Sequence, residues 1–253
     1  MINMMRAELY RLTKSKSFYV FWIGSVLTFL ISVIYQSPGG ISFGAPLEYS
    51  DDIKLDIVQT AMNFTFYFFL IIPVFCIISS EFSEHTIKNT ITSAVSKKKY
   101  FTAKYVFTLV YSLLSFLTVN ILFYIVNRIV NGENYSSPIA EYAKALFGQF
   151  PLFIAIVSVF IFLAFLFRKG VAFNAVTIIT PIVYTTVSLV LFGIGGTKKA
   201  AEKLLSYEIS TMISRLAIEC TDSYRAKCYI GCAAVTVLSF VLGYVLFTKR
   251  ELE

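Results

Sequence analysis

The chain has 253 residues, of which 57% are hydrophobic and only 15% are charged, and its net charge is +7. This apolar fraction is above that of ordinary soluble domains and excludes a soluble enzyme. The basic residues do not gather in a soluble region, which excludes a nucleic-acid-binding domain. Their excess is typical of membrane proteins whose inner loops lie beside anionic lipid.

Six stretches of the chain are apolar and long enough to cross a membrane. A spanning helix needs about 20 such residues, because the hydrocarbon core is about 30 Å thick. None of the six carries Asp, Glu, Lys or Arg in its interior, and strand-like alternation is absent from the sequence. We therefore expect an all-α fold, a single transmembrane domain over residues 1–253. The expected spans are 18–35, 57–79, 105–126, 149–167, 171–192 and 229–247.

The positions of Lys and Arg predict the orientation of these spans. If the N-terminus is cytoplasmic, 13 of the 22 basic residues fall in cytoplasmic segments. The remaining nine fall in longer outer segments, six of them in one mixed-charge loop. Both termini are therefore expected in the cytoplasm, and the protein is expected as a multi-pass protein of the cell membrane.

The segment before the first span, residues 3–17, has helical spacing. Met5, Leu9 and Leu12 share one face, and basic residues occupy the others. This pattern predicts a short helix that lies in the inner membrane interface. A basic tail that only sets the topology is the alternative.

The segment EFSEHTIKNTITSAVSKKKYFTAKY, residues 81–105, is unusually polar for a connection between two spans. Phe82, Ile87 and Ile91 can share one side of a helix, with polar residues on the other sides. Ser96 is in position to cap a second helix that leads into span three. The pattern predicts a short amphipathic helix on the cytoplasmic surface, which a soluble partner could push.

The segment between spans five and six, residues 197–228, is amphipathic but too charged to span. Its apolar residues recur at helical spacing: Leu205, Ile209, Met212, Ile213 and Leu216. It is expected on the outer side, either on the outer leaflet or as a lid over the spans. Cys220 and Cys228 lie near its end, and their spacing allows a disulfide.

Motifs of catalysis or metal binding are absent from the sequence. It has no phosphate-binding glycine loop, no H-E-x-x-H and no G-x-S-x-G. His85 is the only histidine, and no cysteine or second histidine stands near it in the chain as a metal partner. The sequence therefore predicts no enzyme, no catalytic residue, no metal site and no cofactor bound by this chain. A carrier or channel would be expected to show charges within the spans or an inverted repeat, whereas a scaffold or sensor subunit stays open.

Residues 81–104 resemble the loop between spans two and three of the ABC-2 type (type-2 exporter) permeases of ABC transporters. In that family a glutamate that ends span two is followed by Gly-Thr, a hydrophobic helix, a Pro-Val-Ser-Arg-like turn and a lysine that begins span three. Here the corresponding residues are Glu81, His85-Thr86, Ile87 to Ile91, Ala94-Val95-Ser96-Lys97 and Lys104. His85 stands in place of the Gly and Ala94 in place of the Pro. The layout of spans and amphipathic segments resembles that family too.

The resemblance implies the membrane-spanning permease of an ATP-driven exporter. Such a permease pairs with a second one, identical or sibling, and binds two copies of a separate ABC ATPase that holds ATP and magnesium. Its size is similar to that of permeases exporting an amphipathic or antimicrobial peptide or drug. The residues implied in ATPase coupling are Glu81, Phe82, Glu84, His85, Thr86, Ile87 and Lys88. Glu81 and Glu84 are expected on a solvated helix, needed for coupling and not for folding.

Overall fold

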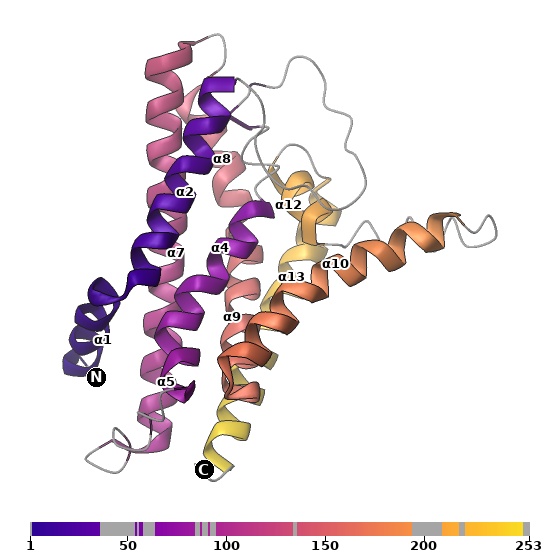
Figure 1. The fold of residues 1–253 in the computed structure, drawn as a ribbon. Coiled ribbons are helices and arrows are strands. Elements are labelled where there is room, and N and C mark those ends of the chain that lie inside the picture. Colours follow the sequence, from indigo (N-terminus) through magenta and orange to yellow (C-terminus); the bar gives the residue numbers. More distant parts are fainter. Residues whose placement is uncertain are drawn as a thin grey trace.

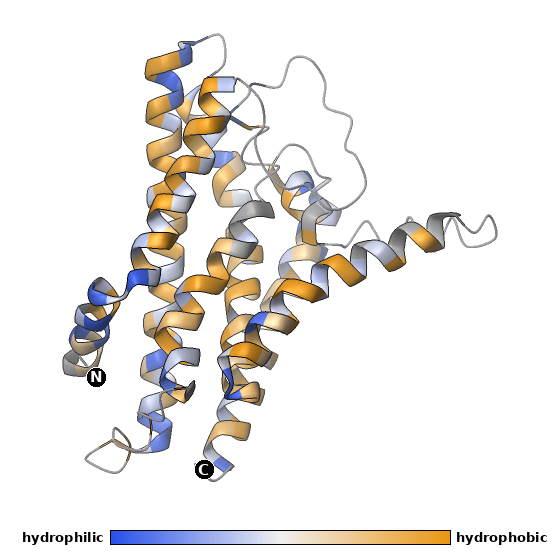
Figure 2. Ribbon diagram, viewed as in Figure 1, coloured by the Kyte–Doolittle hydropathy of each residue, from blue (hydrophilic) through white to orange (hydrophobic). Residues whose placement is uncertain are grey.

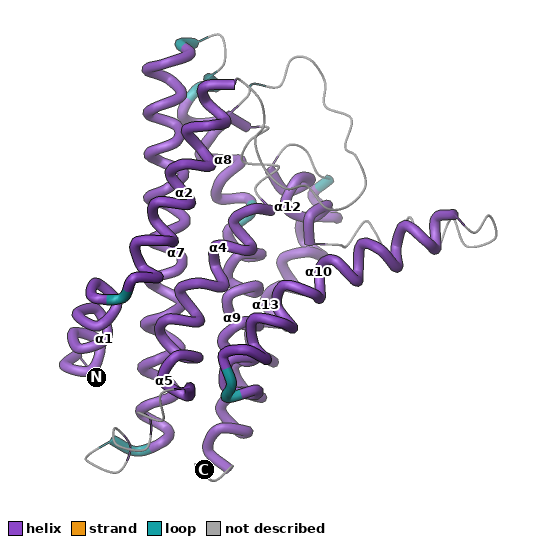
Figure 3. Tube along the Cα trace, in the orientation of Figure 1, coloured by secondary structure: helices purple, strands orange, loops and turns teal. Residues whose placement is uncertain are grey.

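The computed structural model describes residues 2–35, 54, 56–57, 64–83, 87, 91, 95–133, 136–193, 209–217 and 221–249. Within these ranges every regular element is a helix, as Figure 3 shows. The elements are α1 (Ile2–Lys14), α2 (Lys16–Tyr35), α4 (Phe64–Val74), η1 (Phe75–Ser79), α5 (Ser80–Ser83), α7 (Lys97–Asn131), α8 (Ile139–Gly148), α9 (Phe150–Phe167), α10 (Gly170–Gly193), α12 (Ile209–Ala217) and α13 (Asp222–Lys249).

The long helices form an elongated bundle with two distinct ends (Figure 1). The start of α1, the end of α5, the start of α7 and the end of α13 lie at one end, here called the α1 end. Helices α8 and α12 lie toward the opposite end, here called the α12 end. Helix α10 starts beside α9 and slants away from the bundle. Both ends of the described chain thus lie at the α1 end, as expected for termini on one side.

Four helices in the described residues are long and apolar enough to cross a membrane, by length and composition. They are Lys16–Tyr35, Lys97–Asn131, Ile139–Phe167, which joins α8 to α9, and Asp222–Lys249. The regions expected as spans two and five contain shorter apolar helices, Phe69–Phe82 and Gly170–Tyr184. Hydrophobic residues dominate the middle of the bundle, while hydrophilic ones gather in α1 and at both ends of α7 (Figure 2). The all-α membrane fold is confirmed; the count of six spans remains a prediction.

Local sequence signals set the boundaries of several helices. The Ser96 side chain accepts a hydrogen bond from the Lys99 amide at 3.4 Å, so the predicted N-cap of α7 is confirmed. Gly132, with a φ of 69°, ends α7 in a conformation that L side chains rarely adopt. Pro151 lies in the first turn of α9, where its missing amide costs the helix no hydrogen bond. These signals separate α7, α8 and α9 into distinct elements.

An aromatic cluster holds the helices together at the α1 end. Phe101 of α7 and Phe165 of α9 have ring centroids 4.7 Å apart, and Phe165 lies 4.9 Å from Phe247 of α13. All three rings are buried. Such pairs add to the van der Waals packing that drives association of helices in a membrane, where lipid is as apolar as the side chains. Helices α9 and α13 run closely together above this cluster.

Two expected boundaries were wrong. Helix α13 begins at Asp222, so residues 222–228 belong to the last long helix and not to the preceding amphipathic segment. Residues 139–148 form α8, whose buried residues include Tyr142 and Leu146, where the sequence had predicted only an outer connection. Cys228 is buried in α13, and Cys220 lies outside the described residues, so the disulfide between them stays a prediction.

Substitution of Gly243 should loosen the packing of α13 on α7. A side-chain carbon at Gly243 would lie 3.0 Å from the Phe101 ring, whereas one at Gly231 on the same helix has nothing within 4 Å. Gly243→Leu should therefore lower the free energy of unfolding by about 1–3 kcal/mol through overpacking. Gly231→Leu, its matched control, should leave it unchanged or higher. Thermal unfolding in detergent measures both, and equal melting temperatures for the two variants would contradict this packing.

Candidate functional site

Four charged side chains meet inside the protein at the α1 end. They are Glu8 and Arg11 of α1, Glu81 of α5 and Lys104 of α7, here called the charge quartet. Lys104 is fully buried, and Glu81 and Glu8 are only 5% and 8% exposed. Charged residues are rarely buried so deeply unless they are paired, so this cluster is the candidate site.

The quartet alternates in sign and sums to zero charge. Lys104 Nζ lies 2.7 Å from Glu8 Oε1 and 2.8 Å from Glu81 Oε2. Arg11 Nη2 lies 2.9 Å from Glu8 Oε2, and Arg11 Nη1 forms an ion pair with Glu81 Oε1. The Tyr100 hydroxyl also donates to Glu81 Oε2. Each carboxylate is thus shared by both cations, which offsets the cost of taking Glu8, Glu81 and Lys104 out of water, while the Arg11 side chain stays 38% exposed.

Simple helical spacing brings the members of the quartet together. Glu8 and Arg11 are three residues apart on α1 and so project from one face. Tyr100 and Lys104 are one turn apart on α7, and the Lys104 Nζ lies 5.6 Å from the centre of the Tyr100 ring. Glu81 follows the end of the second expected span. Three segments distant in the sequence therefore meet at one point.

The two cations of the quartet also bind main-chain oxygens of η1, a π-helical turn. Lys104 Nζ and Arg11 Nη2 each donate to the Ile77 carbonyl oxygen at 2.9 Å. The Ser80 amide donates to the Phe75 carbonyl five residues earlier, which is the hydrogen bond that defines a π turn. The Ser80 hydroxyl donates to the Cys76 carbonyl at 2.8 Å. The quartet therefore holds α1 and α7 to both the backbone and the Glu81 side chain of the second span region.

Three of the seven predicted coupling residues are described, and all three point into the protein. The expectation of a solvated Glu81 was wrong, because its carboxylate is buried between Lys104, Arg11 and Tyr100. Phe82 is half-buried, with its ring 5.7 Å from Phe165 and 6.4 Å from Phe247.

Ile87, the third described member, is only 3% exposed and belongs to the hydrophobic core. The other four, Glu84, His85, Thr86 and Lys88, lie outside the described residues.

Sequence reasoning predicted a helix over residues 3–17 but missed Glu8, Arg11 and Tyr100 as parts of this site. Leu12 and Glu8 are buried against the bundle, whereas Leu9 is 51% exposed. A signal was present, since Glu8 is the only acidic residue in the basic segment 3–17 and precedes Arg11 by three positions. This lone acidic residue of α1 lies on the side of the helix that meets the buried Lys104.

At the α12 end, α12 packs on α8 through its apolar face. Ile213 and Leu216 are buried, as the helical spacing predicted, and Leu205 lies outside the described residues. The Leu216 carbonyl oxygen would lie 2.6 Å from a side-chain carbon at Gly148, so only glycine permits this approach. The Tyr229 hydroxyl of α13 donates to the Gly148 carbonyl at 2.9 Å. The amphipathic character of this segment is confirmed for Ile209–Ala217.

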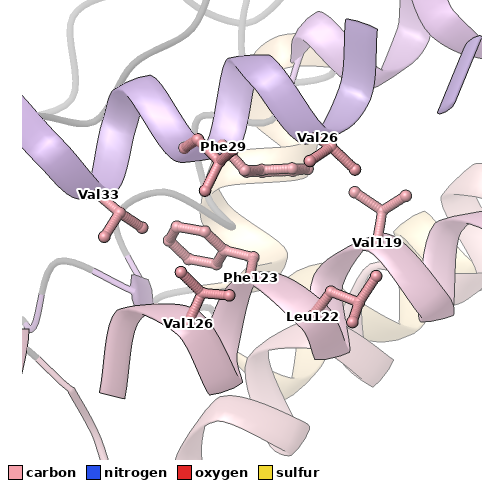
Figure 4. A pocket seen from close by; sticks show the side chains of 8 residues that line it. Val26, Phe29, Val33, Val119, Leu122, Phe123 and Val126 are labelled. Carbon is pink, nitrogen blue, oxygen red and sulfur yellow. The ribbon is translucent and has the colours of Figure 1, made fainter. Parts of the chain in front are cut away.

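An apolar pocket of about 150 Å³ lies between α2 and α7 (Figure 4). Its eight lining residues are Val26, Phe29, Leu30, Val33, Val119, Leu122, Phe123 and Val126. Val26, Leu30 and Leu122 are exposed, so this is an open apolar groove whose lining suits alkyl or aryl groups. Among the described residues no group of His, Cys, Asp or Glu is suited to a metal ion.

The comparisons with known proteins identify the family. A model described as "ABC-2 family transporter protein" matches residues 4–188, a range that contains the whole charge quartet. The chain therefore belongs to the ABC-2 transporter family. This family forms the membrane component of ABC transporters, which is not itself catalytic, and ATP is hydrolysed by a partner ATPase. A search of curated proteins found no match.

Removal of the Lys104 charge should strongly destabilise the protein. Lys104→Met leaves Glu8 and Glu81 buried with one cation between them, and breaking a buried ionic network in this way costs about 3–5 kcal/mol. Lys98→Met, which removes an exposed lysine from the first turn of the same helix, is the matched control and should change stability by less than about 0.5 kcal/mol. Thermal unfolding in detergent compares them. A Lys104→Met protein as stable as the control would show that the quartet does not hold these helices.

Proposed function

We propose that the chain is the permease subunit of an ATP-driven exporter with six spans and cytoplasmic termini. Family membership supports the transporter role, and the observation that carries the proposal is the charge quartet. The quartet connects Glu81, which follows the second expected span, to α1 and α7. It lies at the α1 end of the bundle, where the described chain both begins and finishes. A soluble ATPase that pushes on this end would move three segments together.

The coupling element is the loop that begins at Glu81. Glu84, His85, Thr86 and Lys88 contact the ATPase, while Glu81, Phe82 and Ile87 pass the movement inward. Glu81, Phe82 and Ile87 are packed against the chain's own helices or charges, which supports a role in passing movement inward and not in ATPase contact. Helix α1 takes part through Glu8 and Arg11.

The working transporter contains two permeases and two ATPase subunits. The second permease is identical or a sibling, and ATP with magnesium binds only to the ATPase. The isolated chain lacks a phosphate-binding glycine loop, which supports this assignment. The longest expected cytoplasmic segment has about 25 residues, fewer than the roughly 50 of a small independent domain.

The cargo is an amphipathic or antimicrobial peptide or drug. The apolar pocket between α2 and α7 supports a cargo with an exposed alkyl or aromatic group, since no polar atom lines it. Helix α12 acts as a lid at the outer end. Its close approach to Gly148 supports this role, because it places α12 directly against α8 at that end.

ATP turnover by purified proteins tests the proposal. The isolated chain in lipid nanodiscs should neither bind nor hydrolyse ATP. The chain combined with its ABC ATPase should show ATP hydrolysis that cargo peptides stimulate several-fold. Lys88→Glu should abolish this stimulation by reversing a charge at the contact, whereas the same change at the exposed Lys227, at the start of α13, should not.

Two results would contradict the proposal. ATP hydrolysis by the isolated chain would refute the assignment of ATP hydrolysis to a separate ATPase subunit. Failure of the chain to co-purify with any ABC ATPase would instead favour a carrier, a channel or a scaffold subunit.

A further inference from the structure

The π turn η1 is an irregular point in an otherwise α-helical segment. It lies between α4 and α5, and it is the one π turn among the described helices. A π turn accommodates one extra residue in a helix, is rare, and occurs often at functional sites. It persists only where surrounding contacts favour it over the ordinary α-helix.

Pro73 does not explain the π turn. The missing amide of a proline affects the carbonyl four residues before it, which here is that of Phe69. The π-type hydrogen bond instead begins at the Phe75 carbonyl, on the other side of the proline. Contacts beyond Pro73 must therefore favour the turn.

The quartet provides those contacts on both sides of the turn. Before it, α4 is fixed by Tyr67, whose ring lies 4.9 Å from that of Phe160 and whose hydroxyl donates to the Thr177 carbonyl at 3.1 Å. Within it, the Ile77 carbonyl binds both cations. After it, the Glu81 carboxylate binds the same two cations.

Conversion of η1 to an α-helix, with every residue retained, would rotate everything after the turn. In an α-helix one residue corresponds to about 100° of rotation and 1.5 Å of rise. With α4 fixed, that rotation would carry Glu81 away from Lys104 and Phe82 away from its aromatic partners. The present quartet and an uninterrupted α-helix cannot coexist.

We propose that the charge quartet holds η1 in its π form, and that opening of the quartet converts η1 to an α-helix and rotates the segment that begins at Ser80. Helix α1 supplies two of the four charges, so its displacement opens the quartet. The role of this rotation in turning the ATPase-facing loop rests on the proposed function. The conformational switch itself does not, because it involves only this chain.

A distance measurement on the full chain in nanodiscs, without ATPase, tests the switch. Spin labels are placed at Ser83→Cys, after the turn, and at Lys169→Cys, in the connection between α9 and α10. Cys76, Cys220, Cys228 and Cys232 are replaced by alanine. Rotation by 100° on a helix about 10–12 Å in diameter moves the label at position 83 by about 8 Å, so the distance between the labels changes.

Two variants should give opposite results. One neutralises the quartet with side chains of similar size, Glu8→Gln, Arg11→Met, Glu81→Gln and Lys104→Met, and should give a new distance. The other deletes Ile78, the extra residue, so that an uninterrupted α-helix and the quartet become compatible, and it should keep the original distance. The deletion variant keeps the test decisive if the neutralised protein does not fold. Lys98→Gln, a control at an exposed lysine, should keep the original distance.

The variant Pro73→Ala tests whether the proline, and not the quartet, holds η1 in its π form. It should keep the original distance, since the quartet remains intact. An unchanged distance in the neutralised variant, or a new distance in the deletion variant, would overturn the proposal, as would the new distance in Pro73→Ala alone. A confirmed switch in a chain that shows no ATPase coupling would refute only the proposed function.

Discussion

The burial of Lys104 is the constraint on which the α1 end of the structure depends. A fully buried ammonium group is tolerated only where carboxylates and carbonyl oxygens surround it, and here Glu8, Glu81 and the Ile77 carbonyl do so. The two carboxylates in turn require Arg11 to balance their charge. Helix α1 would otherwise be a short amphipathic segment joined to α2 through Ser15. The shared charges make it a fixed part of the bundle.

The opposite end is built on different interactions. Hydrogen bonds connect separate segments there, such as the donation from the Asn131 amide group of α7 to the Val33 carbonyl at 3.0 Å. Buried Asp56 accepts from the Ser137 amide at 2.9 Å and from its hydroxyl at 2.7 Å. Helix α12 lies on α8 with only a glycine between the two backbones. The two ends of the bundle therefore differ: shared charges hold the α1 end, and hydrogen bonds and a close backbone approach hold the α12 end.

Sequence alone predicted the helical membrane class, the spans near 18–35, 105–126, 149–167 and 229–247, the Ser96 cap and the buried face of α12, since each depends on local composition or spacing. It did not predict the quartet. Glu81 looked solvated because polar residues follow it, and only the approach of α1 and α7 buries it. The π turn has no local signature beyond Pro73, because long-range contacts from Arg11 and Lys104 accompany it. The start of α13 was misjudged because its first turns are polar.

The central claim is that the quartet fixes α1 to the start of α7. The most direct measurement is the distance between spin labels at Tyr10→Cys and Lys98→Cys, two exposed positions on these helices, in lipid nanodiscs and in a chain whose four native cysteines are replaced by alanine. A docked α1 predicts one narrow distance distribution that does not change with lipid composition. A broad distribution, as expected for a helix that moves freely on the membrane surface about Ser15, would contradict the account.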